Sequence, residues 1–279
     1  MARSGKRRIG IVGFGELGDF LSSTLLKDQA VQKEYELAFV WNRSKEALEG
    51  QIPMDLQLEN LEDFETRKPD LIVEVAHPCI TRNMGVRFLR YCDYLAGSPT
   101  AFAEPEIYSA LVDSCQSPHG LYIPRGALPG LEEVLRMQAA GNLMEAHISM
   151  KKHPRSIHFL KELTPPLSQT SQERILYQGP LRELCALAPN NVNTMAVLAL
   201  SSGLGFDKVR ATLIANPELE HHITELHLFG PENEGARYRL SLIRESPAGA
   251  GAVTSTATLK TFLTSMLTAR DAGSGLHFR

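Results

Sequence analysis

The chain has 279 residues, of which 43% are hydrophobic and 22% charged, and its formal net charge is -3 at pH 7. These values are typical of a globular protein with one large or two moderate domains, and the small net charge argues against nucleic acid or an anionic membrane as partner. No apolar run approaches the roughly 20 residues that span a bilayer, and MARSGKRR leads directly into a strand pattern. We therefore expect a cytoplasmic protein without a membrane partner.

The four cysteines, Cys79, Cys92, Cys115 and Cys185, are far apart in the sequence and form no CxxC pair. We interpret them as reduced thiols, in keeping with a cytoplasmic protein, and predict no metal site.

The first 125 residues alternate strand and helix patterns. Residues 9–12 are apolar and precede a glycine turn and apolar residues at helical spacing. Mostly apolar runs, as in buried parallel strands, and helical patterns then follow, at 35–44, 70–76, 80–92 and 105–115. This order predicts an α/β fold in which residues 1–125 form a Rossmann domain with a doubly wound parallel sheet.

The pattern changes after residue 125. We predict a second, α+β domain for substrate binding and dimerisation over residues 126–250, and a C-terminal helix within 251–279 that packs back on the first domain and ends in a flexible tail. The predicted elements are a helix at 132–140, a half-exposed strand at 145–154, a long loop or lid at 155–180, a buried helix at 191–205, antiparallel strands within 209–217, 223–230 and 236–245, and a helix at 258–270.

The glycine turn has the spacing Gly13-x-Gly15-x-x-Gly18 directly after a strand and at the start of a helix. In a dinucleotide-binding turn the first glycine allows the tight turn, the second lets the backbone approach a pyrophosphate, and the third allows close packing. We therefore predict cofactor contacts at Gly13, Gly15, Glu16, Leu17 and Gly18. The alternative is a tight turn without a ligand.

The residues after the second strand, Trp41-Asn42-Arg43-Ser44, indicate which dinucleotide binds. An NAD site usually carries an acidic residue here, whereas an arginine accommodates the 2′-phosphate of NADP. We predict contacts from Asn42, Arg43 and Ser44, and binding of NADP(H) at least as well as NAD(H). The alternative is a surface loop with a solvated arginine.

Two further segments resemble one family, the L-aspartate dehydrogenases. LYIPRGALPGLEE (121–133) is similar to that family's L-Y-I-P-S-G-A-I-x-G-L-D segment, and APNNVNTMAVLALSS (188–202) to its P-x-N-x-N-V-A-A helix start. The resemblance implies oxidative deamination of L-aspartate by NAD(P)+, through iminosuccinate, to oxaloacetate and ammonia. It also implies a homodimer.

The resemblance also implies roles for individual residues. Ala127 would lie against the nicotinamide, Asn191 and Asn193 would hold cofactor or the substrate carboxylate, and Arg125, Lys151 and Lys152 would bind a dicarboxylic amino acid. The alternatives are a plain strand-to-helix turn, ordinary N-capping and surface charges. Arg125 stands where the family segment has serine.

The segment NPELEHHITELH (216–227) aligns with the family's D-P-x-x-x-x-N-x-H-E-I, but Thr224 takes the place of the catalytic histidine and His222 that of the asparagine. Strand alternation would put His222 and Thr224 on one face, which makes His222 our candidate acid/base, with His221 and His227 solvated or partly packed. The alternative function is a catalytically silent NADP(H)-binding protein that senses redox state or binds another protein.

Overall fold

The computed structural model of the chain describes residues 5–115, 118–252 and 254–279. Residues 1–4, the start of the MARSGKRR stretch, lie outside these ranges. The chain divides into two compact units. Unit 1 comprises Met1–Pro124 and Leu263–Arg279, and unit 2 comprises Arg125–Phe262. None of the helices in the described part of the chain is long and apolar enough to cross a membrane.

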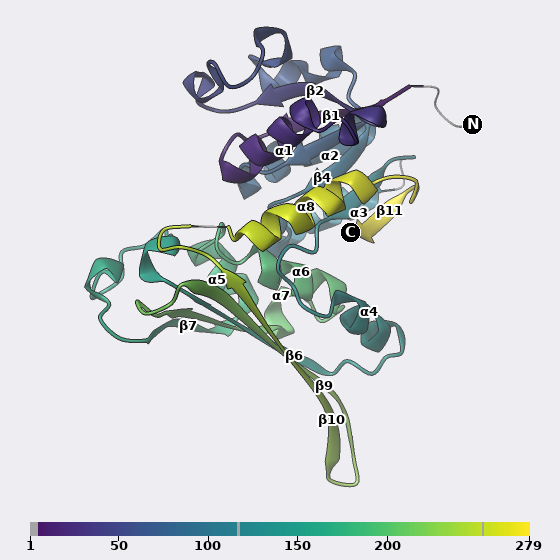
Figure 1. Cartoon of the computed structure of the whole chain (residues 1–279). Helices are drawn as coiled ribbons and strands as arrows, with labels where there is room; N and C mark the ends of the chain where they lie inside the picture. The colour runs from purple at the N-terminus through teal and green to yellow at the C-terminus, as the bar shows by residue number, and fades with distance from the viewer. Residues whose placement is uncertain (1–4, 116–117, 253) are drawn as a thin grey trace. The chain divides into compact units, whose positions relative to one another are not determined.

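Unit 1 is built on a six-stranded sheet in the order β11-β5-β4-β3-β1-β2, in which every pairing is parallel (Figure 1). The predicted Rossmann-like α/β fold is confirmed. Its strands are β1 (Arg7–Val12), β2 (Tyr35–Trp41), β3 (Leu71–Glu74), β4 (Asp93–Ala96), β5 (Gly120–Ile123) and β11 (Gly275–Phe278), and its helices are α1 (Glu16–Lys27), α2 (Pro78–Tyr91) and α3 (Pro105–Ser114).

The central strands are buried on both faces, which explains their continuous apolar sequences. Leu71, Ile72 and Val73 of β3 have no exposed surface, and neither have Ile9 and Ile11 of β1. A strand covered by helices on both sides needs apolar residues at consecutive positions instead of alternate ones. The parallel pairing of β1 with β2 and β3 brings the carboxyl ends of all three strands to one edge of the sheet.

The tail that we predicted to be flexible forms strand β11 instead. Gly275 to Phe278 pair in parallel with Gly120 to Ile123. The chain end is also fixed, because the Arg279 backbone N–H donates to the Ile123 carbonyl at 2.9 Å and the Ser265 hydroxyl donates to the Arg279 carbonyl at 2.7 Å. The prediction failed because a four-residue edge strand has little local signal and depends on a distant partner.

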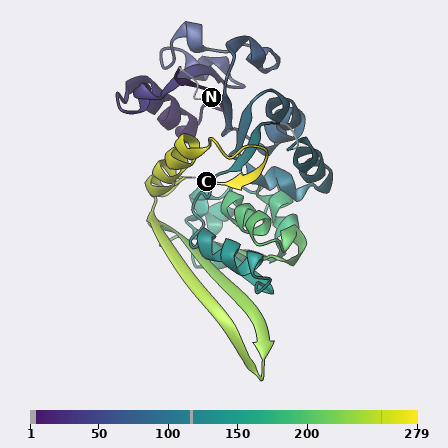
Figure 2. The ribbon, with the colours of Figure 1, turned by 90° about the vertical axis from the view of Figure 1, so that its right-hand side faces the viewer.

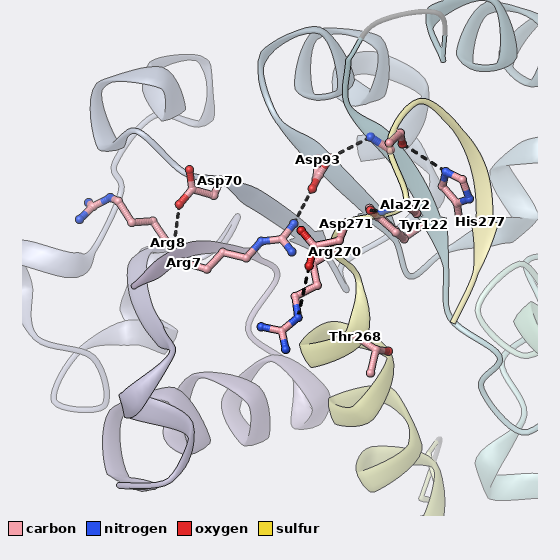
Figure 3. Close-up of polar contacts among 12 residues, drawn as sticks. Arg7, Arg8, Asp70, Asp93, Tyr122, Thr268, Arg270, Asp271, Ala272 and His277 are labelled. Atoms are coloured by element: carbon pink, nitrogen blue, oxygen red, sulfur yellow. Dashed lines mark hydrogen bonds and ion pairs between the residues drawn. The ribbon is translucent and has the colours of Figure 1, made fainter. Parts of the chain in front are cut away.

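Charged residues join the strands at the amino-terminal edge of this sheet (Figure 3). Arg7 at the start of β1 forms an ion pair with Asp93 at the start of β4. Asp93 also accepts a hydrogen bond from the Gly120 backbone N–H at 2.8 Å. Arg270, which follows α8 (Thr256–Thr268), pairs with Glu34 at 2.8 Å. This edge therefore holds together segments that are far apart in the sequence.

Unit 2 is built on a mixed five-stranded sheet in the order β10-β9-β6-β8-β7. β6 is parallel to β8 and antiparallel to β9, and the two outer pairings are antiparallel. The strands are β6 (Glu145–Lys152), β7 (Arg174–Pro180), β8 (Arg210–Ala215), β9 (His221–Asn233) and β10 (Ala236–Pro247). The helices are α4 (Leu131–Ala139), α5 (Leu181–Leu187), α6 (Asn193–Ser201), α7 (Gly205–Lys208) and the start of α8.

Two features of unit 2 differ from the sequence prediction. Part of the predicted 155–180 loop is strand β7, which pairs with β8. β8 runs opposite to β9, as predicted, but β6 lies between them and pairs in parallel with β8. The β9–β10 hairpin extends beyond the other strands (Figure 2), because β6 pairs with β9 only from Ile223 to Phe229.

Candidate functional site

The glycine turn of unit 1 joins β1 to α1 and is shaped by close backbone contacts. Gly13 has a φ of +110°, and a Cβ there would lie 2.8 Å from the Ala76 backbone. A Cβ at Gly18 would lie 2.1 Å from the Gly13 carbonyl oxygen. Both glycines are therefore required by the fold itself, through a turn conformation and a helix-to-strand contact that larger residues cannot make.

Gly15 differs from the other two glycines of the turn. It is exposed, its φ of -86° suits any residue, and a Cβ there would have no heavy atom within 4 Å. No side chain caps the amino terminus of α1, whose first turn contains Glu16, Leu17 and Gly18. Open space beside uncapped helix N–H groups suits the pyrophosphate of a dinucleotide, so the residues present fit the cofactor.

The residues after β2 lie against the glycine turn. The Asn42 side chain accepts a hydrogen bond from the Phe14 N–H at 3.1 Å and donates to the Ser44 carbonyl at 2.9 Å. Arg43 is exposed, and its positive charge, after burial and Arg82, contributes to lowering the pKa of His77. Asn42 thus has a structural role, whereas Arg43 is an exposed cation that follows the end of β2.

A cluster of polar residues, His222, Thr224 and Lys152, lies on one face of the unit 2 sheet. Along β9, His222 and Thr224 are 8% and 2% exposed, whereas His221 is exposed. The predicted alternation is confirmed, and both candidate positions share the buried face. Lys151 of β6 pairs with Ile223, so Lys152 comes opposite His222 at the next position, and it is only 3% exposed.

Burial decides the charges of this cluster. It lowers the pKa of Lys152 to about 8. It also lowers the pKa of His222 to about 4, with a further lowering from the charge of Lys152. Among the described residues, His222 Nε2 has no hydrogen-bond partner and no carboxylate pairs with Lys152. The imidazole is thus neutral beside a lysine that is mostly charged at pH 7.

Asn191 joins this cluster to the segment that follows β6. Its side chain accepts a hydrogen bond from the His158 N–H at 2.8 Å and donates to the Ser156 carbonyl at 2.9 Å. Its carbonyl accepts a hydrogen bond from Lys152 Nζ at 3.4 Å. Asn191 lies before α6, which begins at Asn193. Its amide therefore holds the segment around residues 156–158, and its backbone holds the lysine.

Arg244 is a candidate that we did not predict. It lies on β10 opposite Thr224, and its guanidinium donates to the Gly126 carbonyl at 3.2 Å and to the Ser246 hydroxyl at 3.1 Å. Burial, and then the charge of Arg125, lower the pKa of Arg244. Gly126 has a φ of +56°, and Ala127 follows it. Within residues 5–115, 118–252 and 254–279, the hydrogen bonds of Arg244 go to neutral partners, and a half-buried cation of this kind can bind an anionic ligand.

The other predicted cations of unit 2 are placed differently. Lys151 lies on the opposite face of β6 from Lys152 and pairs with Glu225 at 3.4 Å. Arg125 pairs with Glu132, and both side chains are substantially exposed. The sequence therefore predicted three substrate cations, but the structure brings only Lys152 to the buried face beside His222. His227, also on the opposite face of β9, is hydrogen-bonded to Ser241 at 2.8 Å.

A parallel sheet with a glycine turn after its first strand is typical of NAD(P)-binding dehydrogenases, and unit 2 adds a buried lysine, a half-buried arginine and a neutral histidine. Residues 13–123 match the NAD binding domain of homoserine dehydrogenase, and residues 133–265 match the C-terminal domain of aspartate dehydrogenase. The chain belongs to the family of aspartate dehydrogenase domain-containing proteins, since it is 38% identical to the member from Xenopus tropicalis over 99% of both chains.

More distant relatives include enzymes. The chain is 29% identical to an L-aspartate dehydrogenase from Methanococcoides burtonii, over 80% of this chain and 83% of that protein. The crystal structure of the aspartate dehydrogenase from Thermotoga maritima matches this chain with a TM-score of 0.67 and 19% sequence identity. The match covers 96% of this chain and 98% of the Thermotoga maritima chain. That likeness extends the shared fold over nearly the whole chain.

Proposed function

We propose that the protein catalyses the NAD(P)-dependent oxidative deamination of L-aspartate to oxaloacetate and ammonia. The single observation that carries the proposal is the buried face of unit 2, where Lys152 lies beside the unpartnered Nε2 of His222. Buried cations without a carboxylate partner are costly unless an anionic ligand compensates them. A dicarboxylic amino acid supplies two such anionic groups.

Lys152 and Arg244 are the cations that we assign to the substrate carboxylates. Lys152 supplies a point charge fixed by the Asn191 carbonyl, and Arg244 supplies a planar guanidinium suited to a carboxylate. Arg125 adds positive charge near Arg244. Lys151 forms an ion pair with Glu225 and could bind substrate only if that pair were broken. We therefore assign Lys151 a minor role in substrate binding.

His222 is the group that we assign to proton transfer. Its imidazole is neutral because burial and the charge of Lys152 lower its pKa, so it is able to accept a proton. A substrate carboxylate bound to Lys152 would offset that positive charge and raise the pKa of His222 toward the neutral range, where proton transfer is most effective. Thr224, in the place of the family's histidine, has no such capacity.

The overall reaction balances with water as co-reactant. The glycine turn and Arg43 would hold NAD(P)+, which would supply the hydride acceptor. Once the substrate ammonium has lost a proton to solvent, removal of hydride from Cα of L-aspartate leaves iminosuccinate. Water then adds to the imine carbon, and His222 accepts a proton from this water. Loss of ammonia, which takes up a proton to form ammonium, gives oxaloacetate, and the overall reaction releases one further proton together with NAD(P)H. We assign Ala127 and Asn193 to the cofactor, and we expect NADP(H) to bind at least as well as NAD(H) because of Arg43.

The direct test is reduction of NADP+ and NAD+ on addition of L-aspartate to the purified protein. Activity in the parent, with kcat reduced about 10²- to 10⁴-fold in His222→Ala, would support the assignment. Thr224→Ala is the matched control on the same face of β9 and should keep most of the activity. The absence of L-aspartate-dependent reduction in the parent would contradict the proposal.

A second candidate function is a catalytically silent NADP(H)-binding protein, which Thr224 at the place of the catalytic histidine favours. Thr224→His distinguishes the two. An inactive parent with activity gained in Thr224→His would support the silent protein, because the rest of the substrate face would then be intact. An active parent that depends on His222 would exclude the silent protein.

We also propose that the protein is a cytoplasmic homodimer. Sedimentation tests the oligomeric state, and cell fractionation tests the location.

A further inference from the structure

Glu74, the last residue of β3, is a fully buried carboxylate surrounded by hydrogen-bond donors. One carboxylate oxygen accepts from the N–H groups of Ala76 at 2.7 Å and His77 at 2.9 Å, and from the Ser98 hydroxyl at 3.0 Å. The other accepts from the Ser98 N–H at 2.9 Å and from the Thr81 hydroxyl at 3.5 Å. One side chain therefore joins the turn after β3 to the turn after β4.

The turn after β3 is also the surface against which the glycine turn packs. A Cβ at Gly13 would lie 2.8 Å from the Ala76 nitrogen and Cα, so the two backbones are in direct contact. The Ala76 N–H is one of the groups that donate to Glu74. Moving Ala76 would therefore change the conformation available to Gly13, which begins the cofactor-binding turn.

The same turn continues to the region of Arg43. His77, whose N–H donates to Glu74, accepts the Cys79 N–H at 3.2 Å through its side chain and so caps α2. The charge of Arg43 contributes to lowering the pKa of this imidazole. The residues that Glu74 holds thus adjoin both the pyrophosphate turn and the residue that we assign to the 2′-phosphate.

Only a group that accepts at both oxygens can make this set of contacts. Glutamine has the same shape, but its NH2 group would face N–H donors at one of the two positions and leave them unsatisfied. Burial raises the pKa of Glu74 to about 7 against the effect of its donors. The fold therefore keeps a costly buried acid at the edge of the sheet where the cofactor-binding turn begins.

We propose that Glu74 is a positioning residue for the dinucleotide, which fixes the turns after β3 and β4 and through Ala76 sets the conformation of the glycine turn. It touches neither the cofactor nor the substrate. The inference rests on dinucleotide binding by unit 1 and not on the identity of the amino-acid substrate. It is therefore tested without aspartate.

The test compares Glu74→Gln with Asp93→Asn in the full chain. Asp93 is the matched control, because it is a carboxylate at the opposite edge of the same sheet that accepts the Gly120 N–H and pairs with Arg7 (Figure 3). Dissociation constants for NADPH and NADH are measured by nicotinamide fluorescence, and thermal unfolding is measured in parallel. Both variants should lose thermal stability.

We expect Glu74→Gln to weaken both dinucleotides at least tenfold at a temperature where it is folded, and Asp93→Asn to change neither by more than twofold. Ser98→Ala, which removes only the hydroxyl donor, should be folded and give a smaller loss of affinity of about two- to fivefold. It serves as the test if Glu74→Gln does not fold. Parent-like dinucleotide affinities in Ser98→Ala and in folded Glu74→Gln would overturn the proposal and leave Glu74 a stabilising residue only.

Discussion

Lys152 and His222 lie on neighbouring strands on the buried face of unit 2, each next to the paired residues Lys151 and Ile223, and the charge of the lysine contributes to holding the imidazole neutral. Burial is the larger cause of the lowered pKa. The two residues therefore form an electrostatically coupled pair, in which the state of one changes the proton affinity of the other.

The first prediction concerns this coupling. Lys152→Met should raise the pKa of His222 from its present value of about 4, because one of two causes of the lowering is removed. The pKa should remain below the ordinary value of about 6.5, since burial persists. NMR titration of the His222 imidazole measures the change. Lys151→Met, on the other face of β6, is the control, and an equal shift in both variants would contradict a specific pairing.

The second prediction concerns stability against pH. The pKa of Lys152 is lowered from 10.5 to about 8, so between these values the unfolded chain binds more protons at this site than the folded chain. The cost of burying a charged Lys152 is therefore absent above about pH 10.5, where the lysine is neutral in both states. It grows as the pH falls and is complete below about pH 8. At pH 7, Lys152→Met should be more stable by up to about 3 kcal/mol, at about 1.4 kcal/mol per pKa unit.

Urea unfolding at several pH values tests this expectation. The stability difference between Lys152→Met and the parent should be constant below about pH 8 and should narrow as the pH rises toward 10. Lys151→Met controls for the loss of a lysine from the same strand. A difference for Lys152→Met that stays constant across this range would show that the lysine is not penalised by burial.

The third prediction separates two glycines of one turn. Gly18→Ala should destabilise unit 1 by about 1 to 3 kcal/mol, because its Cβ would meet the Gly13 carbonyl oxygen at 2.1 Å. Gly15→Ala should fold normally, since nothing lies within 4 Å, yet weaken NADPH binding about tenfold by filling the space for the pyrophosphate. Thermal unfolding and fluorescence titration measure both. Unchanged affinity in Gly15→Ala would exclude a dinucleotide from this position.

The fourth prediction concerns cofactor choice. Arg43→Ala should raise the Kd for NADPH about tenfold, since a hydrogen bond between charged groups contributes about 1.5 to 3 kcal/mol, and should leave NADH within twofold. Lys45→Ala is the matched control, because Lys45 is an exposed cation two residues away that pairs with Glu59. A preference for NADH that Arg43→Ala does not alter would assign Arg43 to the surface alone.

The sequence predicted best those parts of the fold whose signal is local. The glycine turn and the strand before it were predicted because spacing and apolar runs alone determine them. Strands β7 and β11 were missed, because each is an edge strand whose pairing partner lies elsewhere in the sequence. The carboxylate of Glu74 was missed for a different reason. Its buried role depends on the turn after β4, which has no sequence signal of its own.

The substrate side shows the same limit. Strand alternation predicted that His222 and Thr224 share a face, but it does not say which face of a neighbouring strand is buried. Lys151 and Lys152 are adjacent in sequence, so they lie on opposite faces of β6. Only the pairing of β6 with β9 shows that Lys152 is the buried cation and that Lys151 is the one paired with Glu225. Arg244 was not predicted, because only the register of the hairpin places it opposite Thr224.

Strand β11 has a consequence for how the protein is made. The sheet of unit 1 starts with β1 near the beginning of the chain and receives its edge strand from residues just before Arg279. During synthesis the ribosome therefore releases all of unit 2 before the first sheet is complete.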